Sequence, residues 1–249
     1  MWNLTVDQWA AVLRSDQNPS DVAHSLAEAG RFVPWSQVLV NETTGCTTTA
    51  DLGSGRGEHS AVLARAGRQT TLVDWSGDNL AFSQGMFRAL GLHGRFCQAD
   101  ITKPLPLESR SIDAVFSCGV FEYFPRAQVE RILAEAFRVA RKRVIIMVPN
   151  ARSVAYRLGK WHMERSQAWP WGGEEPSHSL RAHFRAAGAT NVREYSIGAR
   201  HALGFLTMRG GERLTRLLTR ALHMTDDAQP SRFRQGYLLV TIGDHPDRT

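Results

Sequence analysis

Residues 49–57 read TADLGSGRG, and this stretch decides how the rest of the chain is interpreted. A β-branched, apolar run ends at Asp51 and Leu52, and glycines follow at the alternate positions Gly53, Gly55 and Gly57. Glycine is needed where the backbone φ angle is positive or where a ligand lies against the backbone. A strand followed by such a turn and a helix holds a phosphate, a nucleoside cofactor or nothing beyond a tight turn.

Strands and helices alternate on the carboxyl-terminal side of this turn. Apolar or β-branched runs predict strands at 47–52, 69–75, 94–100, 111–119 and 143–150, and helical spacing predicts helices at 59–67, 79–92 and 127–140. Two more strands are expected at 191–197 and 236–243. The pattern predicts an α/β fold with a doubly wound, mostly parallel sheet, whose ligands bind beyond the carboxyl ends of the strands.

Two phosphate-binding turns do not fit the residues that follow the glycines. A P-loop ends in Gly-Lys-Ser/Thr, whereas Gly57 is followed by Glu58. A dinucleotide fingerprint needs its third glycine at position 58, and a glutamate there would repel a pyrophosphate. The turn therefore suits a cationic or zwitterionic ligand better than a phosphate.

Acidic residues end two of the expected strands. Asp74, in LVDWS, can accept hydrogen bonds from both hydroxyls of a ribose, and Asp100, in CQADI, can accept one from an exocyclic amine. Both fall on the sheet edge that carries the glycine turn. Together these features specify a nucleoside without a phosphate.

This set of motifs resembles the class I methyltransferases that use S-adenosyl-L-methionine. The matching pieces are DLGSGRG, LVDWS, QADI, SIDAVFSCGVFEYFP and RVIIMVPN, in that order over roughly residues 48–150. They look most like the small-molecule branch, the ubiquinone-type or methyltransferase type 11-like enzymes. The resemblance implies a Rossmann-like methyltransferase fold of seven strands, with the last strand, 236–243, antiparallel to the rest.

The resemblance also assigns roles along the sheet edge. It implies that the glycine turn contacts the methionine portion, Asp74 the ribose and Asp100 the adenine, while the backbone at 117–119 borders the sulfonium. Asp51 either contacts the ligand or holds the turn, and Trp75 either lines the adenine pocket or stands exposed. The predicted cofactor-binding residues are Asp51, Gly53, Ser54, Gly55, Gly57, Asp74, Trp75, Ser76, Asp100, Ile101, Ser117, Cys118 and Gly119.

The sequence departs from the family pattern in two places. Tyr123 stands where many relatives have a histidine after the fourth strand, so a role of that histidine cannot be carried over. The residues ARKR, 140–143, replace the usual Lys-Pro-Gly-Gly turn before the fifth strand, which is expected to shorten that turn.

We expect a single methyltransferase domain over 1–249, built in four parts. Residues 1–47 form a helical cap with helices at 5–14 and 19–29, and 31–47 lead through Pro34 and Trp35 into the first strand. Residues 48–150 form the cofactor-binding core, and 151–190 form a lid of two helices joined by an irregular loop. Residues 191–249 complete the sheet and contribute a basic amphipathic helix at 211–224.

The acceptor of the methyl group is narrowed by absent motifs. The Asn/Asp-Pro-Pro-aromatic stretch of enzymes that methylate amino groups of DNA bases and the Pro-Cys nucleophile of pyrimidine carbon-5 methylation do not occur. Arginine methylation uses two glutamates in one loop after the fourth strand, where Glu122 stands alone. We expect transfer to an O, N or C atom of a small molecule, such as a secondary metabolite, and an acidic or aromatic compound is the expected substrate class. An RNA methyltransferase and a non-catalytic cofactor-binding adapter are the alternatives.

The expected lid carries the candidate acceptor-binding residues. Trp161, Trp169 and Trp171 lie in a segment rich in glycine and proline, and they either cover a flat or cationic acceptor or pack on the sheet. His162 and His178 are candidate general bases. Tyr123, beside the expected methyl position, is the remaining candidate catalytic residue. We expect no metal.

The charge is unevenly distributed along the chain. Residues 1–150 hold 15 basic and 15 acidic residues, whereas 151–249 hold 15 basic and 9 acidic ones. This excess indicates a solvated basic face or a preference for an acidic substrate, RNA or an anionic membrane. The helix at 211–224 would either bury its leucines or lie on a membrane surface. We expect a monomer or homodimer without a nucleic-acid partner.

The three cysteines, Cys46, Cys97 and Cys118, are widely spaced and form no CxxC pair, which indicates a reducing compartment. The sequence shows neither an apolar run of transmembrane length nor a secretory signal pattern. We therefore expect a cytoplasmic protein.

Overall fold

The computed structural model describes residues 18–28, 34–206 and 227–246. Two of the predicted helices, at 5–14 and 211–224, lie outside these residues. Among the described residues, no helix combines the length and the apolar character needed to span a membrane.

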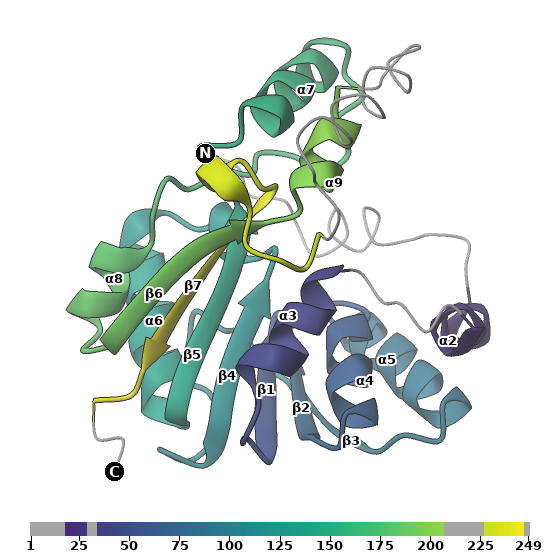
Figure 1. Ribbon diagram of the computed structural model, residues 1–249. Coiled ribbons are helices and arrows are strands. Elements are labelled where there is room, and N and C mark those ends of the chain that lie inside the picture. Colours follow the sequence, from purple (N-terminus) through teal and green to yellow (C-terminus); the bar gives the residue numbers. More distant parts are fainter. Residues whose placement is uncertain (1–17, 29–33, 207–226, 247–249) are drawn as a thin grey trace.

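Seven strands form one mixed sheet in the order β3-β2-β1-β4-β5-β7-β6 (Figure 1). Strands β1 to β5 run parallel, and β7 pairs antiparallel with both β5 and β6. The strand bounds are β1 Thr48–Leu52, β2 Gln69–Asp74, β3 Gly94–Gln98, β4 Ile112–Cys118, β5 Ala140–Pro149, β6 Thr190–Ile197 and β7 Leu238–Asp244. The predicted fold class is confirmed, including the antiparallel last strand.

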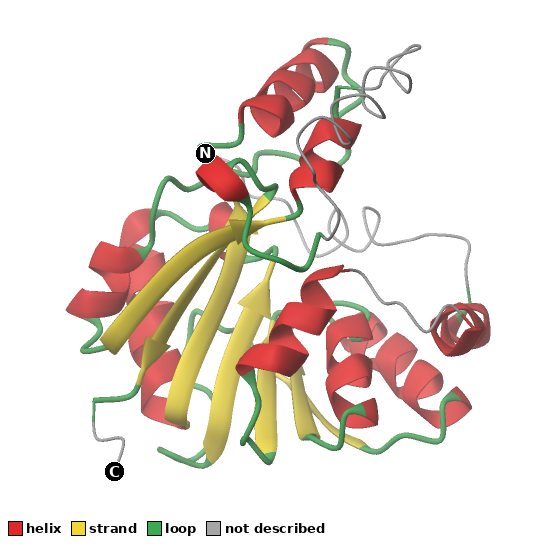
Figure 2. Cartoon of the chain, in the orientation of Figure 1, coloured by secondary structure: helices red, strands yellow, loops and turns green. Residues whose placement is uncertain are grey.

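Helices cover both faces of the sheet (Figure 2). Helices α3, α4 and α5 lie on one face and α6 and α8 on the other, whereas α7 and α9 lie beyond the carboxyl ends of β4 and β5. Their bounds are α2 Pro19–Glu28, α3 Pro34–Glu42, α4 Glu58–Arg65, α5 Gly77–Ala89, α6 Arg126–Val139, α7 Val154–Arg165, α8 Arg181–Ala186 and α9 Ala199–Gly204.

Within the segment 31–47 that leads into the first strand, the structure adds helix α3, which was not predicted from the sequence. Pro34 occupies its first position, where a missing N–H is harmless. Val38 and Leu39 on the helix are buried against the sheet, so the segment is stabilised by packing that the short, β-branched sequence did not reveal. Helix α9 was likewise not predicted from the sequence.

The residues ARKR form the first part of β5 instead of a turn. Helix α6 ends at Val139 and β5 begins at Ala140, so the expected shortening of this connection is confirmed. Arg141 donates to Asp113 Oδ1 over 2.9 Å through Nε, which ties the start of β5 to β4.

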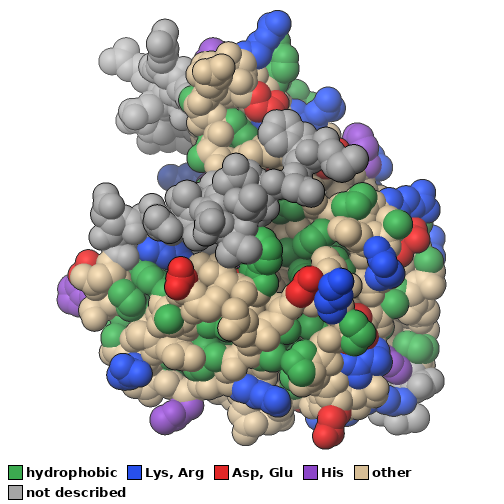
Figure 3. Space-filling model, turned by 180° about the vertical axis from the view of Figure 1, so that it is seen from behind, with side chains coloured by type: hydrophobic (Ala, Val, Ile, Leu, Met, Phe, Trp, Pro, Cys, Tyr) green, Lys and Arg blue, Asp and Glu red, His purple; other side chains and the backbone are tan. Residues whose placement is uncertain are grey.

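The surface in Figure 3 mixes charges of both signs. Lys and Arg side chains are scattered over this face and alternate with acidic and hydrophobic ones. The described part of this face therefore does not present a single basic stripe.

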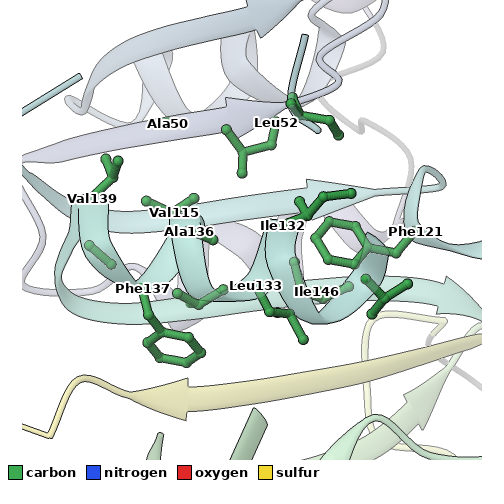
Figure 4. Close-up of a cluster of buried hydrophobic side chains, with 14 of the residues drawn as sticks. Ala50, Leu52, Val115, Phe121, Ile132, Leu133, Ala136, Phe137, Val139 and Ile146 are labelled. Carbon is green, nitrogen blue, oxygen red and sulfur yellow. The ribbon is translucent and has the colours of Figure 1, made fainter. Parts of the chain in front are cut away.

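The largest buried cluster lies between the sheet and α6 (Figure 4). Ile132, Leu133 and Ala136 of α6 point onto Val115 of β4 and Ile146 of β5, and all five are at most 1% exposed. The neighbouring strand residues Phe116 and Ile145 point to the other face, toward α3 and α4. Burial on both faces explains why the strand sequences are continuously apolar.

Candidate active site

The glycine turn after β1 uses its backbone N–H groups within the protein. Gly53, Gly55 and Gly57 have φ angles of 73°, 53° and 78°, which side chains disfavour. The N–H groups of Gly53 and Ser54 donate to the Val73 carbonyl, and Gly57 N–H donates to Ser54 O over 2.9 Å. These donors are therefore engaged, and the turn offers little to a phosphate.

Asp74 joins the glycine turn to the helix that follows β2. Its Oδ2 accepts from Gly55 N–H over 2.8 Å, and its Oδ1 accepts from Ser76 N–H over 2.9 Å. Asn79 Nδ2 also donates to Oδ1 over 3.3 Å, and Ser76 Oγ caps α5 by accepting from Asn79 N–H. The Asp74 side chain thereby fixes two of the segments that the sequence assigns to the cofactor.

Asp51 lies beneath the turn, 2% exposed at the end of β1. Ser60 Oγ, on the first turn of α4, donates to Asp51 Oδ2 over 2.9 Å. Burial raises the pKa of Asp51 to about 8, although this hydrogen bond opposes the shift, and the nearby charge of Asp74 adds to it. A cation bound here would favour the charged form of this carboxyl.

The predicted adenine side lies at the ends of β2 and β3. Trp75 is 43% exposed, and its carbonyl accepts from Gln98 Nε2 over 2.9 Å. Asp100 is exposed and caps a turn, because its Oδ1 accepts from Thr102 N–H and Oγ. Ile101 is buried in the core cluster, 8% exposed. An exposed indole here is free of core packing on one side and offers a surface for stacking.

The end of β4 lies next to the glycine turn. Ser117 Oγ donates to the Leu52 carbonyl over 2.6 Å, so the ends of β1 and β4 are held together. Gly119 has a φ of 73° and donates its N–H to Met147 O over 3.0 Å. Burial raises the pKa of the Cys118 thiol most, and the charges of Glu122 and Asp51 raise it further. The raised pKa makes this thiol a poor nucleophile.

A short 3₁₀ helix, η1 (Phe121–Tyr123), follows at once and carries a buried carboxylate. Glu122 is 5% exposed, and its Oε1 lies 3.7 Å from the position that a Cβ on Gly119 would take. Within the described part of the chain, Glu122 Oε2 is buried without a hydrogen-bond partner. Burial and then the charge of Glu174 raise the pKa of Glu122.

The loop between α7 and α8 crosses this 3₁₀ helix. Tyr123 Oη donates to the Trp171 carbonyl over 3.1 Å, and Glu175 N–H donates to the Glu122 carbonyl over 3.0 Å. Glu174, between these two contacts, is 6% exposed and accepts a hydrogen bond from Tyr156 Oη of α7. The structure thus brings together Glu122 and Glu174, which lie far apart in the sequence.

The predicted tryptophans and histidines of the lid differ in how far they are buried. Trp169 packs against Tyr156 and Phe205, with ring centroids 6.2 Å and 6.0 Å away, whereas Trp161 and Trp171 are 53% and 38% exposed. His162 and His178 occupy exposed positions. Neither histidine is therefore assigned a role as a general base in the proposals.

Three residues near η1 were not predicted from the sequence as site residues: Tyr156, Glu174 and Tyr237. The pairing of Glu174 with Glu122 was not predicted either. The rings of Tyr156 and Tyr237 lie 5.1 Å apart, and the charges of Glu174 and Glu122 both raise the pKa of Tyr237 after burial. One signal was available for Tyr237. An antiparallel strand begins where its parallel neighbours end, and Tyr237 directly precedes β7.

The carboxyl edge of the sheet is therefore acidic. Asp51, Asp74, Glu122 and Glu174 are each at most 6% exposed along this edge. Burying like charges together is unfavourable unless a cation compensates them. The edge fits a ligand that carries positive charge at both its ammonium and sulfonium groups, as S-adenosylmethionine does.

A sequence profile described as a methyltransferase domain matches residues 50–143. These residues form a methyltransferase domain. The match runs from within β1 to the start of β5, the segment that holds the glycine turn, Asp74 and Gly119. The match bears out the prediction of methyltransferase activity, and such a reaction requires a methyl acceptor.

Solved structures of methyltransferases share the fold. Magnesium protoporphyrin IX methyltransferase from Synechocystis, with bound SAH, is 14% identical, with a TM-score of 0.59 over 96% of this chain and 93% of that one. A methyltransferase from Thermotoga maritima, described as a possible histamine N-methyltransferase, is 16% identical, with a TM-score of 0.62 over 96% and 99%. No curated protein matches the sequence. At these identities, the likeness shows the fold alone.

Proposed function

We propose that this methyltransferase acts on a small molecule, which binds between the end of β4 and the loop that joins α7 to α8. The sulfonium of the cofactor would face Gly119, and the acceptor would enter from the side of η1. Residues 151–190 would act as the lid, with the core at 48–150 holding the cofactor.

The proposed placement of the cofactor follows the contacts along the sheet edge. Asp51 and the glycine turn would hold the methionine end, where an ammonium group compensates the buried carboxyl. Asp74 would take the ribose, because it stands between the turn and α5. Trp75, with Asp100 and Ile101, would border the adenine, and the backbone of 117–119 would border the sulfonium. The bound cofactor supplies an electrophilic methyl group, and the protein contributes position and electrostatics.

The observation that carries the proposal is the attachment of the loop to η1. Hydrogen bonds from Tyr123 Oη to Trp171 O and from Glu175 N–H to Glu122 O hold the loop against the residues that follow β4. An acceptor that reaches Gly119 from this side has to fit beneath the loop. This enclosure favours a small molecule over a folded RNA or a protein surface.

Two further observations support a small acceptor. The buried acids around Gly119 would repel a nucleic acid backbone, and the Lys and Arg side chains in Figure 3 are scattered. The structurally similar proteins named above are described by small molecules, a porphyrin and histamine.

The experiment uses cofactor labelled in the methyl group, incubated with the protein and an extract of the source organism. The extract is divided by ultrafiltration into small-molecule and macromolecular fractions. We expect label in the small-molecule fraction and tight binding of S-adenosylhomocysteine by calorimetry. Label that enters the macromolecular fraction and is released by ribonuclease would support the RNA alternative. Cofactor binding without transfer to either fraction would support the adapter.

A further inference from the structure

We propose that the acceptor is an amine that binds as a cation, and that Glu122 takes its proton before the nitrogen attacks the methyl group. Glu174 supplies the second negative charge, and Tyr123, Tyr156 and Tyr237 form the walls. This inference rests on the proposed function, since it names the chemistry of the same acceptor site.

Glu122 has a carboxylate oxygen that lacks a hydrogen-bond partner in the described part of the chain. Its Oε1 lies beside Gly119, and its Oε2 is buried without a partner among the described residues. A buried carboxylate oxygen without a hydrogen bond is costly, so a purely structural residue would be expected to have acquired a donor for it. A ligand that brings a donor and a positive charge removes this cost.

A second buried acid, Glu174, lies near Glu122. Glu174 reaches it from the lid loop, and the hydrogen bond from Tyr156 Oη fixes its side chain. The charge of Glu174 acts on Glu122, on Tyr123 and on Tyr237. Two neighbouring carboxyls attract a cation more strongly than either would alone.

Three tyrosines lie near these two acids. The tyrosine rings of Tyr156 and Tyr237 form an edge-to-face pair with centroids 5.1 Å apart. Tyr123 follows Glu122 directly in the sequence. Its Oη donates to the carbonyl of Trp171 in the loop. Aromatic faces next to carboxylates recognise ammonium groups through cation–π attraction.

The charged neighbours on the surrounding elements do not cancel this field. Lys160 of α7 lowers the pKa of Glu174, but its Nζ pairs with Glu164 and lies 4.7 Å from the Trp169 ring centroid. Asp51 contributes a further acid from β1, through its charge on Cys118. The groups around Gly119 therefore carry more potential negative charge than positive charge, and an anionic acceptor such as a carboxylate would be repelled.

The proposed transfer is balanced in atoms and charge. The bound ammonium gives one proton to the Glu122 carboxylate, which frees the lone pair on nitrogen. The lone pair forms the N–C bond with the methyl carbon while the C–S bond breaks, and its electron pair stays on sulfur as S-adenosylhomocysteine. The product leaves as a methylated ammonium ion, and Glu122 releases its proton to solvent. Burial and the charge of Glu174 raise the pKa of Glu122, which favours transfer of the proton from the ammonium to this carboxylate.

The test compares Glu122→Gln and Glu174→Gln with Glu108→Gln, a control at an exposed glutamate outside the site. The first readout is S-adenosylhomocysteine affinity, which we expect to be unchanged in all three variants. The second is kcat/KM for methyl transfer to the acceptor in the small-molecule fraction of the extract. We expect a fall of about 100-fold or more for Glu122→Gln and a rise of about 10-fold in KM for Glu174→Gln. Glu108→Gln should match the wild type.

Stability separates this role from a structural one. Removing an unmatched buried charge should leave the melting temperature of Glu122→Gln equal to or above that of the wild type. A lower melting temperature together with unchanged kcat/KM would overturn the proposal.

The product decides the chemical class. We expect the labelled product to be retained on a cation exchanger, and tandem mass spectrometry to place the new methyl group on nitrogen. A methyl group on oxygen or carbon would overturn the amine proposal and leave the proposed function standing. No label in any small molecule would overturn both.

Discussion

The proposed cofactor end and the proposed acceptor end of the same sheet edge are built in opposite ways. At the cofactor end, the turn 53–57 donates its N–H groups to Val73, Asp74 and Ser54, and both oxygens of Asp74 accept hydrogen bonds. At the acceptor end, Glu122 is as well buried, yet its Oε2 has no partner among the described residues.

The difference shows which part is already assembled without a ligand. Internal hydrogen bonds preorganise the cofactor turn, so binding there needs little rearrangement. The acceptor end leaves polar capacity unused, which a structure tolerates where a ligand completes it. The variants below test whether the two ends respond differently.

The largest effect is expected from two glycines that share a conformation but differ in crowding. A Cβ at Gly57 would lie 2.6 Å from Leu72 Cδ2, whereas at Gly119 its nearest neighbour is Glu122 Oε1 at 3.7 Å. Gly57→Ala should lower the free energy of unfolding by about 3 kcal/mol, from backbone strain and overpacking, and Gly119→Ala by about 1 kcal/mol. Denaturant unfolding of both variants measures the difference. Equal losses would show that crowding does not distinguish the two ends.

Removal of the Asp74 carboxyl should damage the cofactor end next most severely. Asp74→Ala frees the N–H groups of Gly55 and Ser76, so the preorganised turn is lost. We expect affinity for S-adenosylhomocysteine to fall by roughly 100-fold, since hydrogen bonds to a charged group are worth about 1.5–3 kcal/mol. Calorimetry measures this, with Asp78→Ala at an exposed position of α5 as the control. Unchanged affinity would argue against a cofactor role of Asp74.

Asp51 should make stability depend on pH in a particular direction. Its pKa rises from 3.8 to about 8 on folding, so between these values the folded protein holds a proton that the unfolded chain releases. The free energy of unfolding then decreases as pH rises, by at most about 1.4 kcal/mol per unit. Asp51→Asn removes the titrating group and should flatten this profile.

Denaturant unfolding of wild type and Asp51→Asn between about pH 5 and pH 8 gives the comparison. The variant should gain stability relative to the wild type as pH rises. Parallel profiles would show that Asp51 does not change its protonation on folding.

The smallest effect is expected from the attachment of the lid. Tyr123→Phe removes the donor to Trp171 O, a bond worth about 1 kcal/mol, and leaves the aromatic ring in place. We expect KM for the acceptor to rise by about fivefold, with cofactor affinity unchanged. A change in cofactor affinity alone would place Tyr123 at the cofactor end instead.

The core was accessible from the sequence because its signals are local. Continuous apolar strands, helical spacing in 127–140 and glycines at 53, 55 and 57 each depend on neighbours along the chain, and β1 to β5 formed near the expected bounds. Helix α3 was missed because its burial against β5 and β7 is a long-range contact. Propensity alone is weak for so short a helix.

The sequence by itself determined the α/β fold and the acids at the ends of β1 and β2, since these follow from periodicity and from residue type at a strand end, and its motifs carried the resemblance to the methyltransferases. Only the tertiary structure decided the acceptor end. From the sequence, Glu122 stood alone after β4, and its companion Glu174 lies in a loop whose path depends on packing of α7 and on hydrogen bonds to η1. Contacts between residues so distant in the chain are set by the whole fold, and no local pattern encodes them.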